Sequence, residues 1–310
     1  TGVQTCALPI SGFSPAFVVN GVSYTNCRMC SNGWLALYTT TAPTATTNYT
    51  ALSSAMTNGA VIFAPFGRDL NINTGGMAYR QTIAGVHIFQ WSNYARFGYT
   101  NVGEVINCQV RLNTNNGTIQ FIYGTCTPTA YTAYPQIGWK TGGATAANWS
   151  TDINNVMIDA TGSPNTCDWS SVVMGNANTS TCYFNSANPT VKPASGLTFT
   201  WTPQTGTVVS PVRTFAATTS ITFQGATLSW TAPTNATQYN VQYRAVGSCS
   251  WTNWSGNPVL TNSVTLTGLS ALTTYQVRVQ AASATNTTIY SNIPTSAAGA
   301  GTNGYVATGT

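Results

Sequence analysis

The chain has 310 residues, of which 43% are hydrophobic and 11% aromatic, while only 5% are Asp, Glu, Lys or Arg. Aromatic residues at this frequency exclude a disordered chain, and no apolar run approaches the roughly 18 residues that a membrane-spanning helix needs. The basic residues are scattered singly from Arg28 to Arg278, so the net charge of +5 forms no basic patch for nucleic acid. The length favours about two domains.

Residues 1–10 differ in character from the rest of the chain. Their sequence, TGVQTCALPI, resembles the in-frame translation of a sequencing-adapter oligonucleotide. We therefore interpret 1–10 as a sequence artefact, which removes Cys6 from the cysteine count and would hide any signal peptide before Ser11.

Residues 11–203 are expected to form a β-sandwich with long loops. Short alternating runs rich in Val, Ile, Thr, Tyr and Phe are typical of strands. Residues 113–117, Asn-Thr-Asn-Asn-Gly, predict a hairpin turn because Asn-Gly tolerates the positive φ angles of such turns. The expected strands are 16–22, 33–38, 60–66, 77–82, 86–94, 105–112 and 118–123.

Five segments of this region resemble, in the same order, the nidogen-like β-sandwich modules of secreted bacterial surface proteins. They are Ser31-Asn32-Gly33-Trp34-Leu35, 61–66, 89–91, 108–112 and 119–124. In those proteins such a module is often followed by fibronectin type III repeats. The resemblance implies a secreted surface protein.

Residues 140–190 are rich in Asn, Thr, Ser and Gly and are expected to form long loops with a short strand at 156–158. A linker is expected at 204–211. Strand signals recur at even spacing from 212 to 296, which favours a second sandwich. Segments 228–230, 239–244 and 269–279 resemble a fibronectin type III (Ig-like) domain, in which Trp230 lies on the second strand and Tyr275 is the corner tyrosine. The predicted fold class is therefore all-β with two sandwiches, followed by a tail at 297–310.

Seven cysteines remain after residue 10, which favours an oxidising, extracellular compartment. We expect disulfides between Cys167 and Cys182, between Cys108 and Cys126, and between Cys27 and Cys30. Cys249 is then left over, either as a buried thiol or as a link between chains. The Cys27–Cys30 spacing alone is weak evidence for zinc or redox chemistry, because a zinc site needs a second ligand pair.

Candidate catalytic groups are few, and no enzyme activity, metal or cofactor is predicted. His87 lies in an expected strand, where a structural histidine is the common outcome. The five carboxylates leave little choice for a pair of glycosidase acids, and Asp152 with Asp159 would be a poor calcium site. Trp251 and Trp254 could stack on sugars, although packing against the sheet of a fibronectin-type domain is the more common role.

The sequence also holds seven candidate glycosylation sites of the form Asn-x-Ser/Thr. They are Asn48, Asn116, Asn148, Asn178, Asn235, Asn253 and Asn286.

Near-neutral surfaces favour tight packing between copies, because burying them desolvates few charges. Both ends of the chain contain strand-like segments, and the assembly candidates are Phe17, Val18, Val19, Tyr305 and Val306. We therefore predict an extracellular or cell-surface structural protein, the subunit of a bacterial surface filament, which assembles with itself head-to-tail, as a helical homopolymer, through strand addition at its termini. The alternative is a secreted monomeric adhesin that binds carbohydrate.

Overall fold

The structure is a computed structural model. Its regular elements are strands, which occur along the whole described chain. The structure describes residues 9–10, 12–43, 51–52, 60–131, 133–141, 156–158, 169, 172–174, 182–187, 190–216, 219–222, 224–291 and 305–306. No helix occurs among these residues, as the all-β prediction requires. Within the same ranges, no helix has the length and apolar character to cross a membrane.

The chain divides into two compact units, residues 1–160 with 175–203 and residues 161–174 with 204–310. The division falls between Pro203 and Gln204, at the start of the expected linker. Each unit is a β-sandwich and is described by itself.

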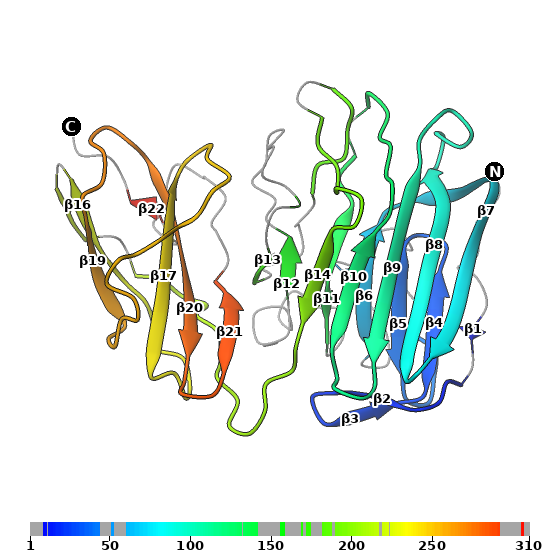
Figure 1. The fold of residues 1–310 in the computed structure, drawn as a ribbon, viewed down its shortest axis with the longest axis horizontal. Helices are drawn as coiled ribbons and strands as arrows, with labels where there is room; N and C mark the ends of the chain where they lie inside the picture. The colour runs from blue at the N-terminus through cyan, green and yellow to red at the C-terminus, as the bar shows by residue number, and fades with distance from the viewer. Residues whose placement is uncertain are drawn as a thin grey trace. The chain divides into compact units, whose positions relative to one another are not determined.

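The first unit consists of two sheets and a small hairpin (Figure 1). The first sheet has the order β1-β4-β5-β6-β11-β12 and the second the order β14-β10-β9-β8-β7, while β2 pairs with β3. The strands are β1 (Pro9–Ile10), β2 (Phe17–Val19), β3 (Val22–Tyr24), β4 (Asn26–Cys30), β5 (Trp34–Tyr38), β6 (Val61–Gly67), β7 (Leu70–Ile83), β8 (Val86–Arg96), β9 (Ile106–Asn113), β10 (Ile119–Tyr123), β11 (Gln136–Lys140), β12 (Val156–Ile158) and β14 (Thr198–Trp201).

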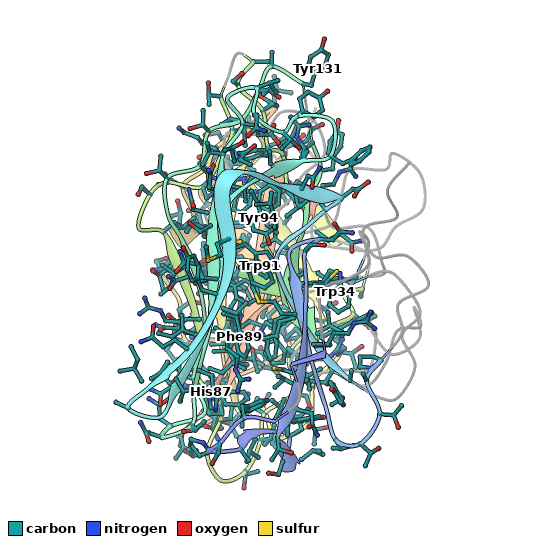
Figure 2. The ribbon with its side chains drawn as sticks, turned by 90° about the vertical axis from the view of Figure 1, so that its right-hand side faces the viewer. Trp34, His87, Phe89, Trp91, Tyr94 and Tyr131 are labelled. Carbon is teal, nitrogen blue, oxygen red and sulfur yellow. The ribbon has the colours of Figure 1, made fainter. Side chains whose placement is uncertain are left out.

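The core of the first unit lies between its two sheets and is rich in aromatic residues. Phe89, Trp91 and Tyr94 of β8 lie on the side that faces the first sheet (Figure 2). Two hydrogen bonds cross between the sheets, because buried Trp and Tyr need a polar partner. Trp91 Nε1 donates to the Cys30 carbonyl at 2.8 Å, and Tyr123 Oη donates to the Pro65 carbonyl at 2.8 Å.

The two sheets differ in what covers their outer faces. In the first sheet the central strands β5, β6 and β11 are buried throughout. Ala51 and Leu52 pack on it in a small apolar cluster with Ala36, Ile62 and Ala64. In the second sheet, β9 alternates between buried and half-buried residues, so its outer face meets solvent.

One sequence expectation for this unit is corrected. The expected strand at 16–22 is a hairpin, because Asn20 and Gly21 take φ values of 49° and 77° and form a tight turn between β2 and β3. Pro9 and Ile10 pair with Arg28 and Cys27 as β1. The hypothesis that residues 1–10 are an artefact gains no support from this pairing.

The second unit has one sheet of order β15-β16-β19 and another of order β18-β17-β20-β21, with β22 also paired to β20. Its strands are β13 (Val172–Met174), β15 (Thr219–Thr222), β16 (Gly225–Ser229), β17 (Gln238–Ala245), β18 (Thr252–Asn253), β19 (Ser263–Thr267), β20 (Tyr275–Ala282), β21 (Thr287–Tyr290) and β22 (Tyr305–Val306).

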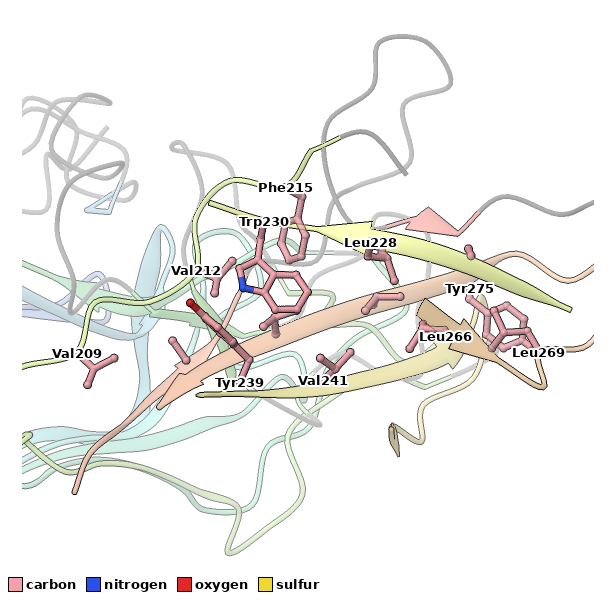
Figure 3. Packing of buried hydrophobic residues seen from close by; sticks show 14 residues of the cluster. Val209, Val212, Phe215, Leu228, Trp230, Tyr239, Val241, Leu266, Leu269 and Tyr275 are labelled. Carbon is pink, nitrogen blue, oxygen red and sulfur yellow. The ribbon is translucent and has the colours of Figure 1, made fainter. Parts of the chain in front are cut away.

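The core of the second unit is built around Trp230, whose ring lies 5.0 Å from that of Tyr239 (Figure 3). The Tyr275 hydroxyl accepts a hydrogen bond from the Ser270 amide at 2.9 Å. A tyrosine that bonds a few residues upstream in this way is the corner tyrosine of Ig-like sandwiches, as the sequence predicted. Val209 is fully buried in this core, so packing of the second unit begins inside the expected linker.

Candidate functional site

The edge strand β7 is a long and largely exposed strand of the first unit. It is 14 residues long, pairs with β8 on one side and ends the second sheet. Met77, Tyr79 and Ile83 alternate along one face of it, and their exposed fractions are 51%, 47% and 51%. No strand among the described residues pairs with the other side of β7.

The hairpin of β7 and β8 fixes this edge. Ala84 and Gly85 have φ values of 48° and 80°, as a two-residue hairpin turn requires. Asn115 Nδ2 holds the turn by donating to the Ala84 carbonyl at 2.9 Å. The register then runs without interruption from Ile83 opposite Val86 back to Met77 opposite Ser92.

An irregularity between Ile72 and Met77 separates this regular stretch from the start of β7. A Cβ at Gly76 would lie 2.4 Å from the Asn93 carbonyl oxygen, so the close approach requires glycine. Asn73 Nδ2 holds the bulge by donating to the Glu104 carbonyl at 2.7 Å. The edge available for strand addition is therefore Met77 to Ile83.

The outer face of the second sheet continues from β7 as an almost uncharged surface. Gln90 on β8 accepts from Gln109 on β9 at 2.7 Å, and Gln109 accepts from Arg111 at 2.9 Å. Gln120 on β10 donates to Thr200 on β14 at 3.2 Å. Of the residues named, Arg111 alone carries a charge.

The inner side of β7 rests on the N-terminal segment. His87 is buried, and its Nε2 lies 2.7 Å from the Pro15 carbonyl while its Nδ1 lies 2.8 Å from Thr82 Oγ1. Arg80 donates to the Gly12 carbonyl at 2.9 Å, and the Phe13 ring meets the imidazole edge-on at 4.5 Å. Burial lowers the pKa of His87, and the nearby Arg80 charge lowers it further. Both ring nitrogens hold structural contacts, so His87 fastens this segment beneath β7.

The described segments that contain the assembly candidates, β2 and β22, pair within their own chain. Phe17 and Val19 are buried, which corrects their assignment as assembly residues, because their hairpin packs its apolar side inward. Val18 alone of the three is exposed. Tyr305 and Val306 form β22, opposite Gln276 and Tyr275 of β20.

A family model described as NIDO related matches residues 7–203, and a model of the fibronectin type III domain matches residues 210–296. The chain belongs to the NIDO-related family. Its NIDO-related domain corresponds to the first sandwich, and a fibronectin type III domain follows it. Both domains are of a type found in extracellular proteins.

Comparison with solved structures finds similarities that each cover 27–31% of this chain. The fibronectin type III domain of the human collagen alpha-1(XX) chain has 24% identity, covers 31% of this chain and 99% of its own, and gives a TM-score of 0.21. A titin module from human cardiac muscle has 25% identity, 27% and 92% coverage, and a TM-score of 0.22. A structure of titin kinase with its flanking domains has 21% identity and a TM-score of 0.24, and the match covers 27% of this chain and 16% of that one. Comparison with the curated proteins finds no match.

The expected disulfides are not formed in this structure. Cys27, Cys108, Cys126 and Cys182 carry thiols, whereas Cys30 and Cys249 are disulfide-bonded. Cys27 and Cys30 lie three residues apart on the same strand, about 10 Å at the usual rise, which is too far for a disulfide.

Cys108 lies opposite Tyr123 in the register of β9 and β10, and Cys126 Sγ instead contacts the backbone of Asn107. The predicted disulfide between Cys108 and Cys126 is therefore wrong. The predicted disulfide between Cys167 and Cys182 is wrong as well, because Cys182 carries a thiol, although Cys167 itself lies outside the described residues. Cys249 is not left over as a thiol. Burial raises the pKa of Cys126 to about 11 and that of Cys108 well above its usual range.

The glycosylation candidates fall in different environments. Asn116, Asn235 and Asn253 are exposed. Asn286 is buried, and its Nδ2 donates to the Thr205 and Thr207 carbonyls, so a glycan there would break both bonds. Asn48, Asn148 and Asn178 lie outside the described residues, as do Asp152 and Asp159.

Neither a metal centre nor an exposed tryptophan pair is found in the described ranges. No group of three His, Cys, Asp or Glu there could hold a metal ion. Trp251 is covered by the guanidinium groups of Arg244 and Arg278, at 4.4 and 4.2 Å from its ring, and Trp254 packs against the core. The packing role expected for Trp251 is therefore confirmed.

The sequence predicted a strand at 77–82, which is most of the open stretch of β7, but not that this strand lies at the edge of its sheet. The alternation of Met77, Tyr79 and Ile83 was visible, but nothing local shows that their strand ends a sheet.

Proposed function

We propose that this chain is an extracellular structural protein whose copies assemble into a filament by strand addition at the open edge of β7. The observation that carries the proposal is the edge itself. It is long, contains no proline, and has one charged residue, Arg80. Proteins that stay monomeric usually protect such an edge with charges, proline, a covering loop or a very short strand.

The proposed donor is the C-terminal tail, residues 297–310, of the next copy. Its Tyr305-Val306 segment forms strand, but its pairing with β20 is two residues long, against eight between β17 and β20. Releasing it therefore breaks few backbone hydrogen bonds. A donor and an acceptor on different surfaces make a heterologous contact, which propagates into a filament instead of closing as a dimer.

The composition supports such a contact. With 5% charged residues, two surfaces of this chain meet without burying many ions. The outer face beside β7 offers amide and hydroxyl groups that can bond to a similar face. Nothing in this arrangement calls for a catalytic group, a metal or a cofactor, and none is proposed.

The test is electron microscopy and sedimentation of the purified chain, together with three variants. Tyr79→Lys puts a charge on the β7 edge, and removal of 297–310 deletes the donor. Thr265→Lys adds the same charge at an exposed position of β19 in the second unit. We expect filaments from the unmodified chain and from Thr265→Lys, and single particles from the other two.

Filaments that persist in Tyr79→Lys would show that β7 is not the contact. Single particles from the unmodified chain would refute assembly and favour the competing proposal, a monomeric carbohydrate-binding adhesin.

A further inference from the structure

One end of the NIDO-related domain carries large apolar side chains on loops. Phe97 and Val102 lie between β8 and β9, and Tyr131 and Tyr134 lie between β10 and β11. Their exposed fractions are 57%, 63%, 68% and 43%. Figure 2 shows Tyr131 at the tip of this end, opposite the end that holds His87.

The exposed rings are supported by other tyrosines. Tyr131 lies 5.6 Å from Tyr99 with an angle of 51° between the rings, and Tyr134 lies 4.8 Å from the buried Tyr183 with an angle of 68°. Such contacts hold each exposed ring in a defined orientation. Tyrosine gives a large contact area with little loss of side-chain entropy on binding.

A buried ion pair forms the base of this end. Arg96 Nε donates to Glu104 Oε1 and Oε2 at 2.8 and 2.9 Å, and Arg96 Nη2 also bonds to Oε2. Thr129 of the β10–β11 loop donates to Glu104 at 3.1 Å and accepts from Arg96 at 2.7 Å. The pair therefore fastens the two loops together, and the Arg96 guanidinium lies 4.3 Å from the Tyr99 ring.

The loop residues of this end favour an uncharged ligand. None of Phe97, Tyr99, Val102, Tyr131 and Tyr134 is charged, and the Arg96 and Glu104 charges neutralise each other beneath the Tyr99 ring. Contact with these side chains would cost a charged ligand its hydration without supplying a counter-charge. A pyranose ring fits better, because its C–H face can stack on a tyrosine ring while its hydroxyl groups stay in water or bond to the tyrosine hydroxyl.

We propose that the loop end of the NIDO-related domain, defined by Phe97, Tyr99, Val102, Tyr131 and Tyr134, is a binding site for neutral carbohydrate. This site is separate from the β7 edge and goes beyond the proposed assembly. Binding residues are commonly placed on loops held by a rigid sandwich, as these are.

The test is saturation-transfer NMR and calorimetry of the full chain with neutral pentasaccharides of glucose, mannose, galactose and N-acetylglucosamine. We expect at least one to bind. Tyr131→Ala removes an exposed ring and should weaken that binding about tenfold, whereas Tyr131→Phe, which keeps the ring, should weaken it less. Leu260→Ala in the fibronectin type III domain is the matched control, because Leu260 is 74% exposed against 68% for Tyr131, and it should leave binding unchanged.

Absence of binding to every sugar, or equal binding by Tyr131→Ala, would overturn the proposal. Loss of assembly in Tyr131→Ala with no sugar binding would also overturn it, and would make the loop end a contact between copies. Because Tyr79→Lys tests assembly and Tyr131→Ala tests binding, the two proposals can fail independently.

Discussion

Replacing Glu104 with Gln should destabilise the NIDO-related domain strongly. Glu104 is fully buried and Arg96 nearly so, and the carboxylate accepts bonds from Arg96 and Thr129. Glu104→Gln leaves the guanidinium charge buried without its counter-charge. Breaking a buried pair in this way costs about 3–5 kcal/mol. For a domain of this size, that loss lowers Tm by about 6–20 °C.

The measurement is thermal and urea unfolding of the full chain, followed by tryptophan fluorescence, with the double variant Arg96→Met/Glu104→Gln beside each single one. The double variant leaves no buried charge, so we expect it to be no less stable than Glu104→Gln alone. Arg111→Met is the control, because this half-buried arginine on the outer face should change stability by less than about 0.5 kcal/mol. A loss below about 1 kcal/mol in Glu104→Gln, or additive losses in the double variant, would refute the reasoning.

Three further predictions concern other buried groups. The pKa of His87 is lowered in the folded state, so its contribution to stability is complete above pH about 6.5 and is lost as pH falls through the folded pKa. His87→Gln should therefore flatten the dependence of Tm on pH in that range. An unchanged dependence would contradict this prediction. Tyr275→Phe removes the bond to the Ser270 amide and should cost the second domain about 1 kcal/mol in urea unfolding. With its pKa raised to about 11 by burial, Cys126 should react with a disulfide reagent at pH 8 only after unfolding, and rapid native labelling would be inconsistent with this.

The sequence predicted those turns and strands that depend on residues close together in the chain. The Asn-Gly turn at 113–117 placed β9 and β10, and the structure pairs them with Leu112 opposite Ile119. Trp230 and Tyr275 identified the fibronectin type III sandwich because each has a fixed position in that fold, Trp230 on the second strand and Tyr275 at the tyrosine corner. Asn20-Gly21 also indicates a turn, but the apolar residues around it led to the prediction of one continuous strand at 16–22.

Contacts between distant segments could not be predicted in this way. The order β4-β5-β6-β11 pairs β6 with β11, where Lys140 lies opposite Ile62 although the two are far apart in the sequence, and no periodicity encodes such pairing. The loop end depends on a further non-local contact, since Glu104 meets Arg96 within one loop but Thr129 comes from another. Disulfide pairing failed for the same reason, because spacing along the chain says nothing about which faces the cysteines occupy.

The scarcity of carboxylates has a consequence for how the basic residues are used. Arg28 donates to the Pro43 carbonyl at 2.7 Å, Arg80 to the Gly12 carbonyl at 2.9 Å and Lys140 to the Leu52 carbonyl at 2.7 Å. Each bond ties a loop or terminal segment to a sheet. In the described part of the chain, Arg96 and Glu104 form the one ion pair, and it is buried.

At 0.1 M salt, the interaction between exposed charges more than about 10 Å apart is largely screened. Buried ion pairs and hydrogen bonds to carbonyls are screened much less. Stability and assembly should therefore change little between 0.05 and 0.5 M NaCl, about a threefold change in Debye length. Assembly through complementary charged patches would weaken over the same range. Filaments that dissolve at high salt would thus argue against strand addition at β7, even if Tyr79→Lys also abolished them.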